Sequence, residues 1–229
     1  MVRQDERVLY PVAHRIVPPV LRAIWRPHVL GLERVPRTGA LILASNHQSF
    51  IDSVLIPAVT PRPVNFLAKS DYFEGRGVKG RLIKEWFETF GALPVDRSDS
   101  KAALASLDTA LAVLAEGGAF GIYPEGTRSR DGRLYRGRTG VAQLALTSGA
   151  PIIPVGLLDT DRLQPVGSNR PRLVRVTVKF GEPIDVRGAY DGVPPGKARR
   201  EITDRVMAAI QQLTGQEAAG VYNDRAPDA

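Results

Sequence analysis

The stretch GALILASNHQSFIDSVLIPAV, residues 39–59, contains the pattern that decides the fold. Its first part, residues 39–45, is a short apolar run that starts at a glycine, which is typical of a buried strand. Its second part, residues 49–59, carries apolar residues in a pattern that indicates a helix. Because only a short turn separates the two, the stretch predicts a strand that leads directly into a helix, the repeating unit of an α/β fold.

The same alternation continues along the chain. We expect further strands at residues 63–69, 92–96, 119–124, 151–158 and 172–181. We expect further helices at residues 78–90, 100–116, 139–148 and 197–214. These elements predict one α/β domain over residues 31–214, in which a single mixed, largely parallel sheet is covered by helices.

The two ends of the chain fall outside this domain. Residues 1–30 include an apolar stretch, residues 8–30, that is interrupted by the pair Pro18-Pro19 and flanked by arginines. Proline breaks helices, so we expect two short amphipathic helices here. Such a segment can lie in a membrane interface or pack on the protein core, and the pattern alone leaves both open. After the last helix, residues 215–229 are expected to form a flexible tail.

The composition excludes several kinds of site. The 229 residues include no cysteine, which rules out disulfides, thiolate metal ligands and a cysteine nucleophile. With three histidines, we expect no multi-histidine metal centre. No window reaches the roughly 20 apolar residues that span a bilayer, and the charged start, MVRQDER, is not typical of a signal peptide. The net charge of +7 favours anionic partners, namely nucleic acid, anionic lipid or phosphorylated small molecules.

The clearest chemical motif is NHQSFID, residues 46–52, in the turn between the first strand and its helix. Ligands gather at such strand ends in open α/β sheets. The turn can bring the Asp52 carboxylate to the His47 ring, where it would support the charge that the imidazole gains as a general base. The motif lacks a nucleophile, so it would act on a hydroxyl of a substrate. The structural alternative is a capping box, in which Ser49 and Asp52 only stabilise the start of the helix.

A second motif, YPEGTRSR at residues 123–130, follows another strand and opens an arginine-rich loop. Gly126 permits close approach of the backbone to a ligand. Thr127 and Arg128 are suitable ligands for a phosphate group. The alternative is an ordinary turn with solvated arginines.

Two weaker blocks complete the set. GALPVDR, residues 91–97, ends a strand with an arginine, and PIIPVG, residues 151–156, indicates a buried strand. In order and spacing the four blocks resemble the glycerolipid acyltransferase family, whose typical member is 1-acylglycerol-3-phosphate acyltransferase. That family carries NHxxxxD, a glycine-to-arginine block, PEGTR or PEGTS, and an apolar block with proline. The resemblance runs from about Leu41 to Gly156 and implies the family's α/β fold.

The resemblance also implies a mechanism. His47 would be the general base on an acceptor hydroxyl, and Asp52 would orient it. The hydroxyl would attack the thioester carbonyl of an acyl-CoA or acyl carrier protein, without an acyl-enzyme. The implied substrate-binding residues are Asn46, Arg97, Glu125, Gly126, Thr127 and Arg128. The arginines would take the acceptor phosphate, whereas Glu125 would orient an arginine or a hydroxyl, because like charges repel. No metal or organic cofactor is implied.

The same resemblance implies partners and a location. The acceptor would be a lysophospholipid, 1-acylglycerol-3-phosphate, which would give phosphatidic acid. Glycerol-3-phosphate, lyso-ornithine lipid and glycolipids are the alternative acceptors. Some members of the family have amphipathic N-terminal helices that seat on the bilayer, which favours a membrane role for residues 8–30. The implied location is the cytoplasm, in peripheral contact with the anionic inner face of the cell membrane.

Other classes of function agree less well with the sequence. Residues 75–80 (GRGVKG) match GxGxxG, but residues 71–74 separate them from the preceding strand, unlike the tight turn of a dinucleotide site. Nucleic acid would suit the positive charge, yet the chain has no recognisable binding motif and only 7% aromatic residues. A non-catalytic lipid-binding homologue is disfavoured by the intact His47 and Asp52. We therefore expect no nucleic-acid partner.

Overall fold

The computed structural model describes residues 19–69, 92–95 and 100–224, apart from residues 166 and 169. The predicted helix at 78–90, the GxGxxG match and Arg97 lie outside these residues. The strands are β1 (His28–Leu30), β2 (Leu41–Ser45), β3 (Val64–Lys69), β4 (Ala92–Val95), β5 (Ala119–Ile122), β6 (Ile152–Leu158) and β7 (Thr177–Phe180). The helices are η2 (Leu32–Arg34), α2 (Asp52–Val59), α4 (Ser100–Ala115), α5 (Gly140–Ser148), α6 (Thr160–Leu163) and α7 (Pro195–Thr214). Residues 19–25 are also helical.

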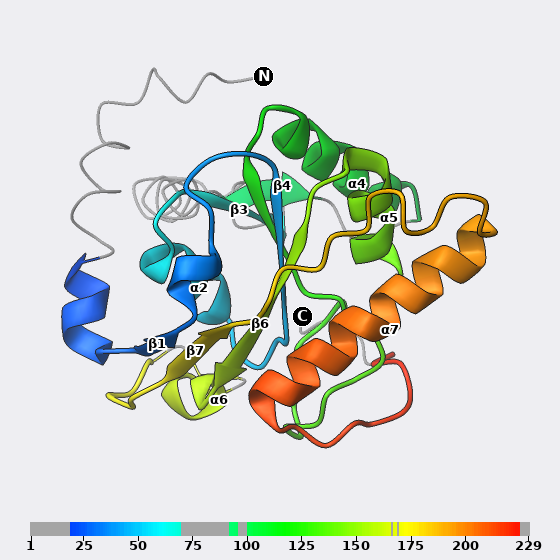
Figure 1. The fold of residues 1–229 in the computed structure, drawn as a ribbon. Coiled ribbons are helices and arrows are strands. Elements are labelled where there is room, and N and C mark those ends of the chain that lie inside the picture. The colour runs from blue at the N-terminus through cyan, green and yellow to red at the C-terminus, as the bar shows by residue number, and fades with distance from the viewer. Residues whose placement is uncertain (1–18, 70–91, 96–99, 166, 169, 225–229) are drawn as a thin grey trace.

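The described strands form one sheet in the order β1-β7-β6-β2-β5-β3-β4 (Figure 1). The five strands from β6 to β4 are parallel to one another. Strand β7 is antiparallel to β6, and β1 is parallel to β7. The sheet is therefore mixed and largely parallel, which confirms the predicted fold class.

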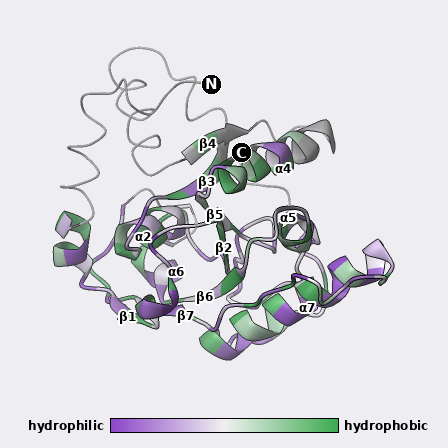
Figure 2. Cartoon of the chain, turned by 45° about the horizontal axis from the view of Figure 1, so that its top comes forward, coloured by the Kyte–Doolittle hydropathy of each residue, from purple (hydrophilic) through white to green (hydrophobic). Residues whose placement is uncertain are grey.

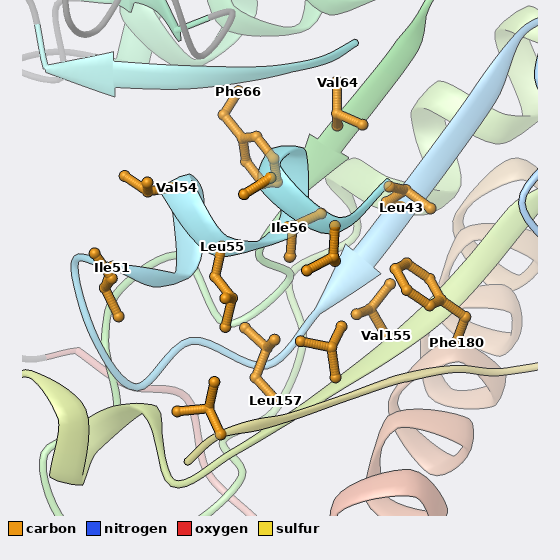
Figure 3. Packing of buried hydrophobic residues seen from close by; sticks show 14 of the residues in the cluster. Leu43, Ile51, Val54, Leu55, Ile56, Val64, Phe66, Val155, Leu157 and Phe180 are labelled. Atoms are coloured by element: carbon orange, nitrogen blue, oxygen red, sulfur yellow. The ribbon is translucent and has the colours of Figure 1, made fainter. Parts of the chain in front are cut away.

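Helices cover both faces of this sheet and create two apolar cores. Leu41 and Leu43 of β2 point into one core, with α2 and residues 19–25. The alternate residues Ile42 and Ala44 point into the other core, with α4, α5 and α7. Figure 3 shows the first core, where the apolar side chains of α2 pack against side chains from one face of the sheet. Figure 2 shows that hydrophobic and hydrophilic residues alternate along α7, as expected for a helix with one face on the core.

The order of the strands places the two sequence motifs at the same edge of the sheet. Strand β2 leads into the histidine loop (residues 46–51), and its parallel neighbour β5 leads into the arginine loop (residues 125–138). Ala44 lies opposite Ile122, so both strands end together. The helices that follow these loops, α2 and α5, cover opposite faces of the sheet. A crevice between such diverging connections is where open α/β folds hold ligands.

Several boundaries differ from those predicted. Helix α2 starts at Asp52 rather than at residue 49, because the preceding residues form a loop held by that carboxylate. Strand β7 is shorter than the alternating pattern at 172–181, because β6 ends at Leu158, opposite Thr177. Strand β1 was not predicted, since three residues are too few to show a period.

The N-terminal segment packs partly on the core. Leu21 and Trp25 are less than 10% exposed and belong to the apolar cluster beneath α2. Arg22 Nε donates a hydrogen bond to the Ala58 carbonyl at 2.6 Å. Trp25 is thus a core residue, so this part of the segment packs on the protein core. Of the predicted segment at 8–30, only the part from residue 19 onward is described.

The predicted flexible tail also differs from the structure. After α7, the described residues 215–224 return along the arginine loop (Figure 1). Asn223 is only 4% exposed. The polar composition that suggested a solvated tail is explained by hydrogen bonds to the arginine loop. The last residues of the chain, 225–229, lie outside the described part.

Candidate active site

The histidine loop brings His47 and Asp52 into contact. His47 Nδ1 lies 2.9 Å from Asp52 Oδ2. The same oxygen accepts hydrogen bonds from the backbone N–H groups of Gln48 and Ser49, both at 2.8 Å. The Asp52 N–H donates to the Ser49 carbonyl at 3.2 Å rather than to the Ser49 hydroxyl, so the reciprocal capping box is not completed; that hydroxyl donates to the Gln164 carbonyl at 2.7 Å. Asp52 therefore stabilises the loop and orients the imidazole with one oxygen.

This contact decides which imidazole nitrogen can act as a base. Because the Asp52 carboxylate faces Nδ1, the proton of neutral His47 lies there, and Nε2 is the nitrogen that can accept another. The His47 side chain is 16% exposed, whereas that of Asp52 is fully buried. Water therefore screens the carboxylate poorly, which strengthens its effect on an imidazolium. The pair has the geometry of a general base with its orienting partner.

Tyr123 covers one face of the His47 ring. The two rings are stacked, with centroids 3.8 Å apart and planes 9° from parallel. The Tyr123 ring also stacks on Phe66 at 5.4 Å, and its hydroxyl forms a 2.9 Å hydrogen bond with the Ser53 hydroxyl. Tyr123 is thus fixed on two sides and restricts rotation of the imidazole. We assigned Tyr123 no role of its own from the sequence. The one feature that could have indicated a role is its position directly before the PEGTR motif.

Glu125 fixes the backbone of the histidine loop from the neighbouring loop. Its Oε1 accepts the His47 N–H at 3.0 Å, and its Oε2 accepts the Tyr135 N–H at 2.9 Å. The His47 carbonyl in turn accepts the Ser129 N–H at 2.7 Å. Both backbone polar groups of His47 are therefore bound by the arginine loop. These contacts differ from the prediction that Glu125 orients an arginine or a hydroxyl.

The burial of Glu125 changes its acidity. Glu125 is 1% exposed, and this burial raises its pKa to about 7. The hydrogen bonds from the Tyr135 and His47 backbones oppose the rise in pKa, whereas the negative charges of Asp52 and Asp131 add to it. Glu125 therefore changes charge close to neutral pH.

Asn46 ties the histidine loop to β6. Its Oδ1 accepts the Leu157 N–H at 2.8 Å, and its Nδ2 donates to the Leu157 carbonyl at 2.9 Å. Nδ2 also donates to Gln216 Oε1 at 2.9 Å. Asn46 is fully buried. The polar atoms of Asn46 thus bind the protein itself, at the residue of β6 that directly follows the apolar block PIIPVG.

The arginine loop carries the remaining predicted binding residues. Gly126 is exposed and adopts a left-handed backbone with φ of 81°, a conformation that favours glycine. Thr127 and Arg128 are partly exposed beside it. Two other arginines of this loop form ion pairs: Arg133 with Asp131 at 2.8 Å, and Arg138 with Asp224 at 3.1 Å. Arg97, predicted to share the phosphate, lies outside the described residues.

Within residues 19–224, less the gaps, no three His, Asp or Glu side chains are arranged to hold a metal ion. No helix in the described part of the chain is long and apolar enough to cross a bilayer.

Comparison with known proteins identifies the family. The sequence profile of the Acyltransferase family matches residues 26–158, which include both loops of the site. The chain belongs to the acyltransferase family. The match begins just before β1 and ends with β6, so it contains the central strands of the sheet.

Two relatives of the chain carry the same name. A 1-acyl-sn-glycerol-3-phosphate acyltransferase of Bacillus subtilis is 30% identical over 187 residues, which are 81% of this chain and 86% of the relative. A chloroplastic enzyme of that name from Brassica napus is 28% identical over 146 residues, or 63% of this chain. The match spans only 40% of the Brassica relative's length.

A solved structure shows the same fold. The crystal structure of the 1-acyl-sn-glycerophosphate acyltransferase from Thermotoga maritima aligns with a TM-score of 0.64 at 23% identity. The alignment covers 93% of this chain and 84% of that one. Its coverage extends well beyond the residues that match the family profile.

Proposed function

We propose that this acyltransferase moves a fatty acyl group from acyl-CoA or acyl carrier protein to the free hydroxyl of 1-acylglycerol-3-phosphate, giving phosphatidic acid. The observation that carries this proposal is the His47–Asp52 contact, at the carboxyl ends of the paired strands β2 and β5 and beside the loop of Arg128. A histidine base next to a phosphate-binding loop suits an acceptor that carries both a hydroxyl and a phosphate. The names of the relatives support the same acceptor.

The proposed reaction has one proton shuttle and no covalent enzyme intermediate. The acceptor oxygen attacks the thioester carbonyl carbon while His47 Nε2 removes the hydroxyl proton. The carbon–sulfur bond then breaks, and the departing thiolate takes the proton from the imidazolium. Asp52 supports the imidazolium throughout, because its buried carboxylate is 2.9 Å from Nδ1.

The acceptor phosphate is assigned to the arginine loop. Gly126 lets the backbone approach an anion closely, and Thr127 and Arg128 supply a hydroxyl and a guanidinium. Arg97, predicted from the sequence, would add a second cation. In this proposal Asn46 and Glu125 act on the loops rather than on the substrate, since their polar atoms bind other parts of the protein.

A competition assay tests the proposed acceptor. The purified protein would be offered lysophosphatidic acid, glycerol-3-phosphate and a lyso-lipid without phosphate together, with acyl-CoA as donor and His47→Ala as the background control. We expect phosphatidic acid as the main product, because the loop selects a phosphate. A main product from the lyso-lipid without phosphate would contradict the assignment of the arginine loop. If the main product comes from glycerol-3-phosphate, then glycerol-3-phosphate is the acceptor and the proposal of 1-acylglycerol-3-phosphate is wrong.

We further propose peripheral contact with the anionic inner face of the cell membrane. Val20 and Ile24 are about half exposed, in contrast to the buried Leu21 and Trp25 of the same helix. A depression of about 350 Å³ lies nearby, lined by three arginines, Arg22, Arg26 and Arg175, over an apolar floor. Apolar side chains beside cations suit the boundary between lipid headgroups and acyl chains.

A further inference from the structure

The residues that follow α7 lie against the arginine loop along most of its length. We call residues 216–224 the C-terminal strap, drawn in red in Figure 1. Backbone hydrogen bonds join it to the loop: Leu134 N–H to the Glu217 carbonyl at 2.8 Å, and Ala219 N–H to the Leu134 carbonyl at 2.9 Å. Arg136 N–H also donates to the Val221 carbonyl at 2.9 Å. The strap thus pairs with the loop much as a short strand would.

Side chains at both ends of the strap contact the two loops of the candidate site. Gln216 Nε2 donates to the Gly132 carbonyl at 2.7 Å, while its Oε1 accepts the Asn46 amide at 2.9 Å. One side chain therefore bridges the arginine loop and the histidine loop. At the other end, Asn223 Nδ2 donates to the Arg128 carbonyl at 3.1 Å.

The strap also restrains arginines of the loop. The Tyr222 ring lies under the guanidinium groups of Arg136 and Arg138, at 5.1 and 5.5 Å from the ring centroid. Asp224 forms a 3.1 Å ion pair with Arg138. Each of these exposed contacts stabilises the arginine loop only slightly. They add to the backbone hydrogen bonds that join the same loop to the strap.

We propose that the C-terminal strap positions the arginine loop for the acceptor, with Asn223 as the positioning residue for Arg128. Asn223 is 4% exposed, so the geometry of its bond to the Arg128 carbonyl is restricted by packing. The backbone at Arg128 sets where the guanidinium can reach, and phosphate binding depends on that position. The strap lies outside the residues that match the family profile, and its role rests on the function proposed above for Arg128.

Steady-state kinetics with each substrate varied in turn tests this role. We expect Asn223→Ala to raise the KM for lysophosphatidic acid about 3- to 10-fold, the range for one lost hydrogen bond. The KM for acyl-CoA and kcat at saturating acceptor should change less than about twofold. Gln216→Ala, a second and less buried substitution, should raise the acceptor KM in the same direction. Asn65→Ala is the matched control, because it also removes an amide donor to a backbone carbonyl, that of Ala119.

Arg128→Ala separates the strap from the function on which it rests. If Arg128→Ala raises the acceptor KM while folded Asn223→Ala and Gln216→Ala leave it unchanged, the strap has no positioning role. Equal rises in the KM for donor and acceptor would also overturn the proposal, since they indicate general loss of structure. If Arg128→Ala itself leaves the acceptor KM unchanged, the assignment of Arg128 is wrong and the proposal for Asn223 falls with it.

Discussion

The Asp52 carboxylate has two structural consequences that a sequence motif cannot separate. Its Oδ2 accepts two backbone N–H groups and also faces His47 Nδ1. The first set of contacts holds the loop, and the last one orients the imidazole. Within the described residues, its Oδ1 has no hydrogen-bond partner. Loop geometry and base geometry are therefore coupled through one atom, which explains why a capping pattern and a catalytic pattern coincide here.

Glu125 gives a prediction about stability and pH. Its pKa is raised to about 7 by burial, from an ordinary value of 4.5. Between these two pH values the folded protein binds more protons at this site than the unfolded chain does. The contribution of Glu125 to the free energy of unfolding should therefore be most stabilising below pH 4.5. This stabilisation should be lost as the pH rises to 7. The slope is at most about 1.4 kcal/mol per pH unit.

Comparison of the wild-type protein with a variant that cannot titrate at position 125 isolates the contribution of Glu125. Urea unfolding of the wild-type protein and of Glu125→Gln would be measured from pH 5 to pH 8, because glutamine does not titrate. We expect the difference, wild type minus variant, to decrease up to about pH 7 and to level off above it. A difference that is constant over the whole range would show that Glu125 ionises normally.

At the scale of elements, parallel pairing of β2 and β5 builds the site. His47 and Glu125 are 78 positions apart in sequence. They meet because the strands that precede their loops, β2 and β5, are hydrogen-bonded neighbours. Strand β6, on the other side of β2, anchors the histidine loop through Leu157. Gly156 lets α7 pack closely there, because a Cβ at this position would lie 2.7 Å from the Leu213 Cβ. The apolar block thus supports the site through packing.

The helix at residues 19–25 carries the prediction about membrane contact. Deletion of residues 1–30 would remove β1 and two core residues, so surface substitutions are the cleaner change. We expect the double variant Val20→Ser/Ile24→Ser to bind vesicles containing phosphatidylglycerol more weakly than the wild type. Replacing Arg26 or Arg175 with glutamine should weaken the same binding about fivefold each, and less at high salt.

Co-sedimentation with vesicles measures this binding. Leu146→Ser is the control, since Leu146 is also an exposed apolar residue of a helix but lies on α5, at the other face of the sheet. Binding by the double variant that equals both wild type and control would place the membrane contact elsewhere.

At the scale of the whole molecule, the sequence predicted what depends on local pattern. Alternation and helical spacing indicated the elements of the sheet, and motif order indicated His47 and Asp52. Contacts between residues that are distant in sequence could not be predicted, because a local pattern does not show which distant residues meet in the fold. Gln216 reaches Asn46 across 170 positions, and Asn223 reaches Arg128 across 95. Nothing in the polar sequence after α7 distinguishes these side chains from those of a solvated tail.

In the proposed mechanism, His47, oriented by Asp52, removes the proton of the acceptor hydroxyl. The measurement that tests it most directly is kcat of acyl transfer by His47→Ala and Asp52→Asn, at saturating lysophosphatidic acid and acyl-CoA, beside their melting temperatures. Asparagine keeps an oxygen for the Gln48 and Ser49 N–H groups, so Asp52→Asn should melt close to the wild type.

We expect His47→Ala to lose roughly 10²- to 10⁴-fold in kcat while remaining folded, because the base is gone. Asp52→Asn should lose at least about tenfold, because the imidazolium has lost its supporting charge. A folded His47→Ala protein with near-normal turnover would contradict the mechanism, and near-normal turnover by Asp52→Asn would leave Asp52 with a purely structural role.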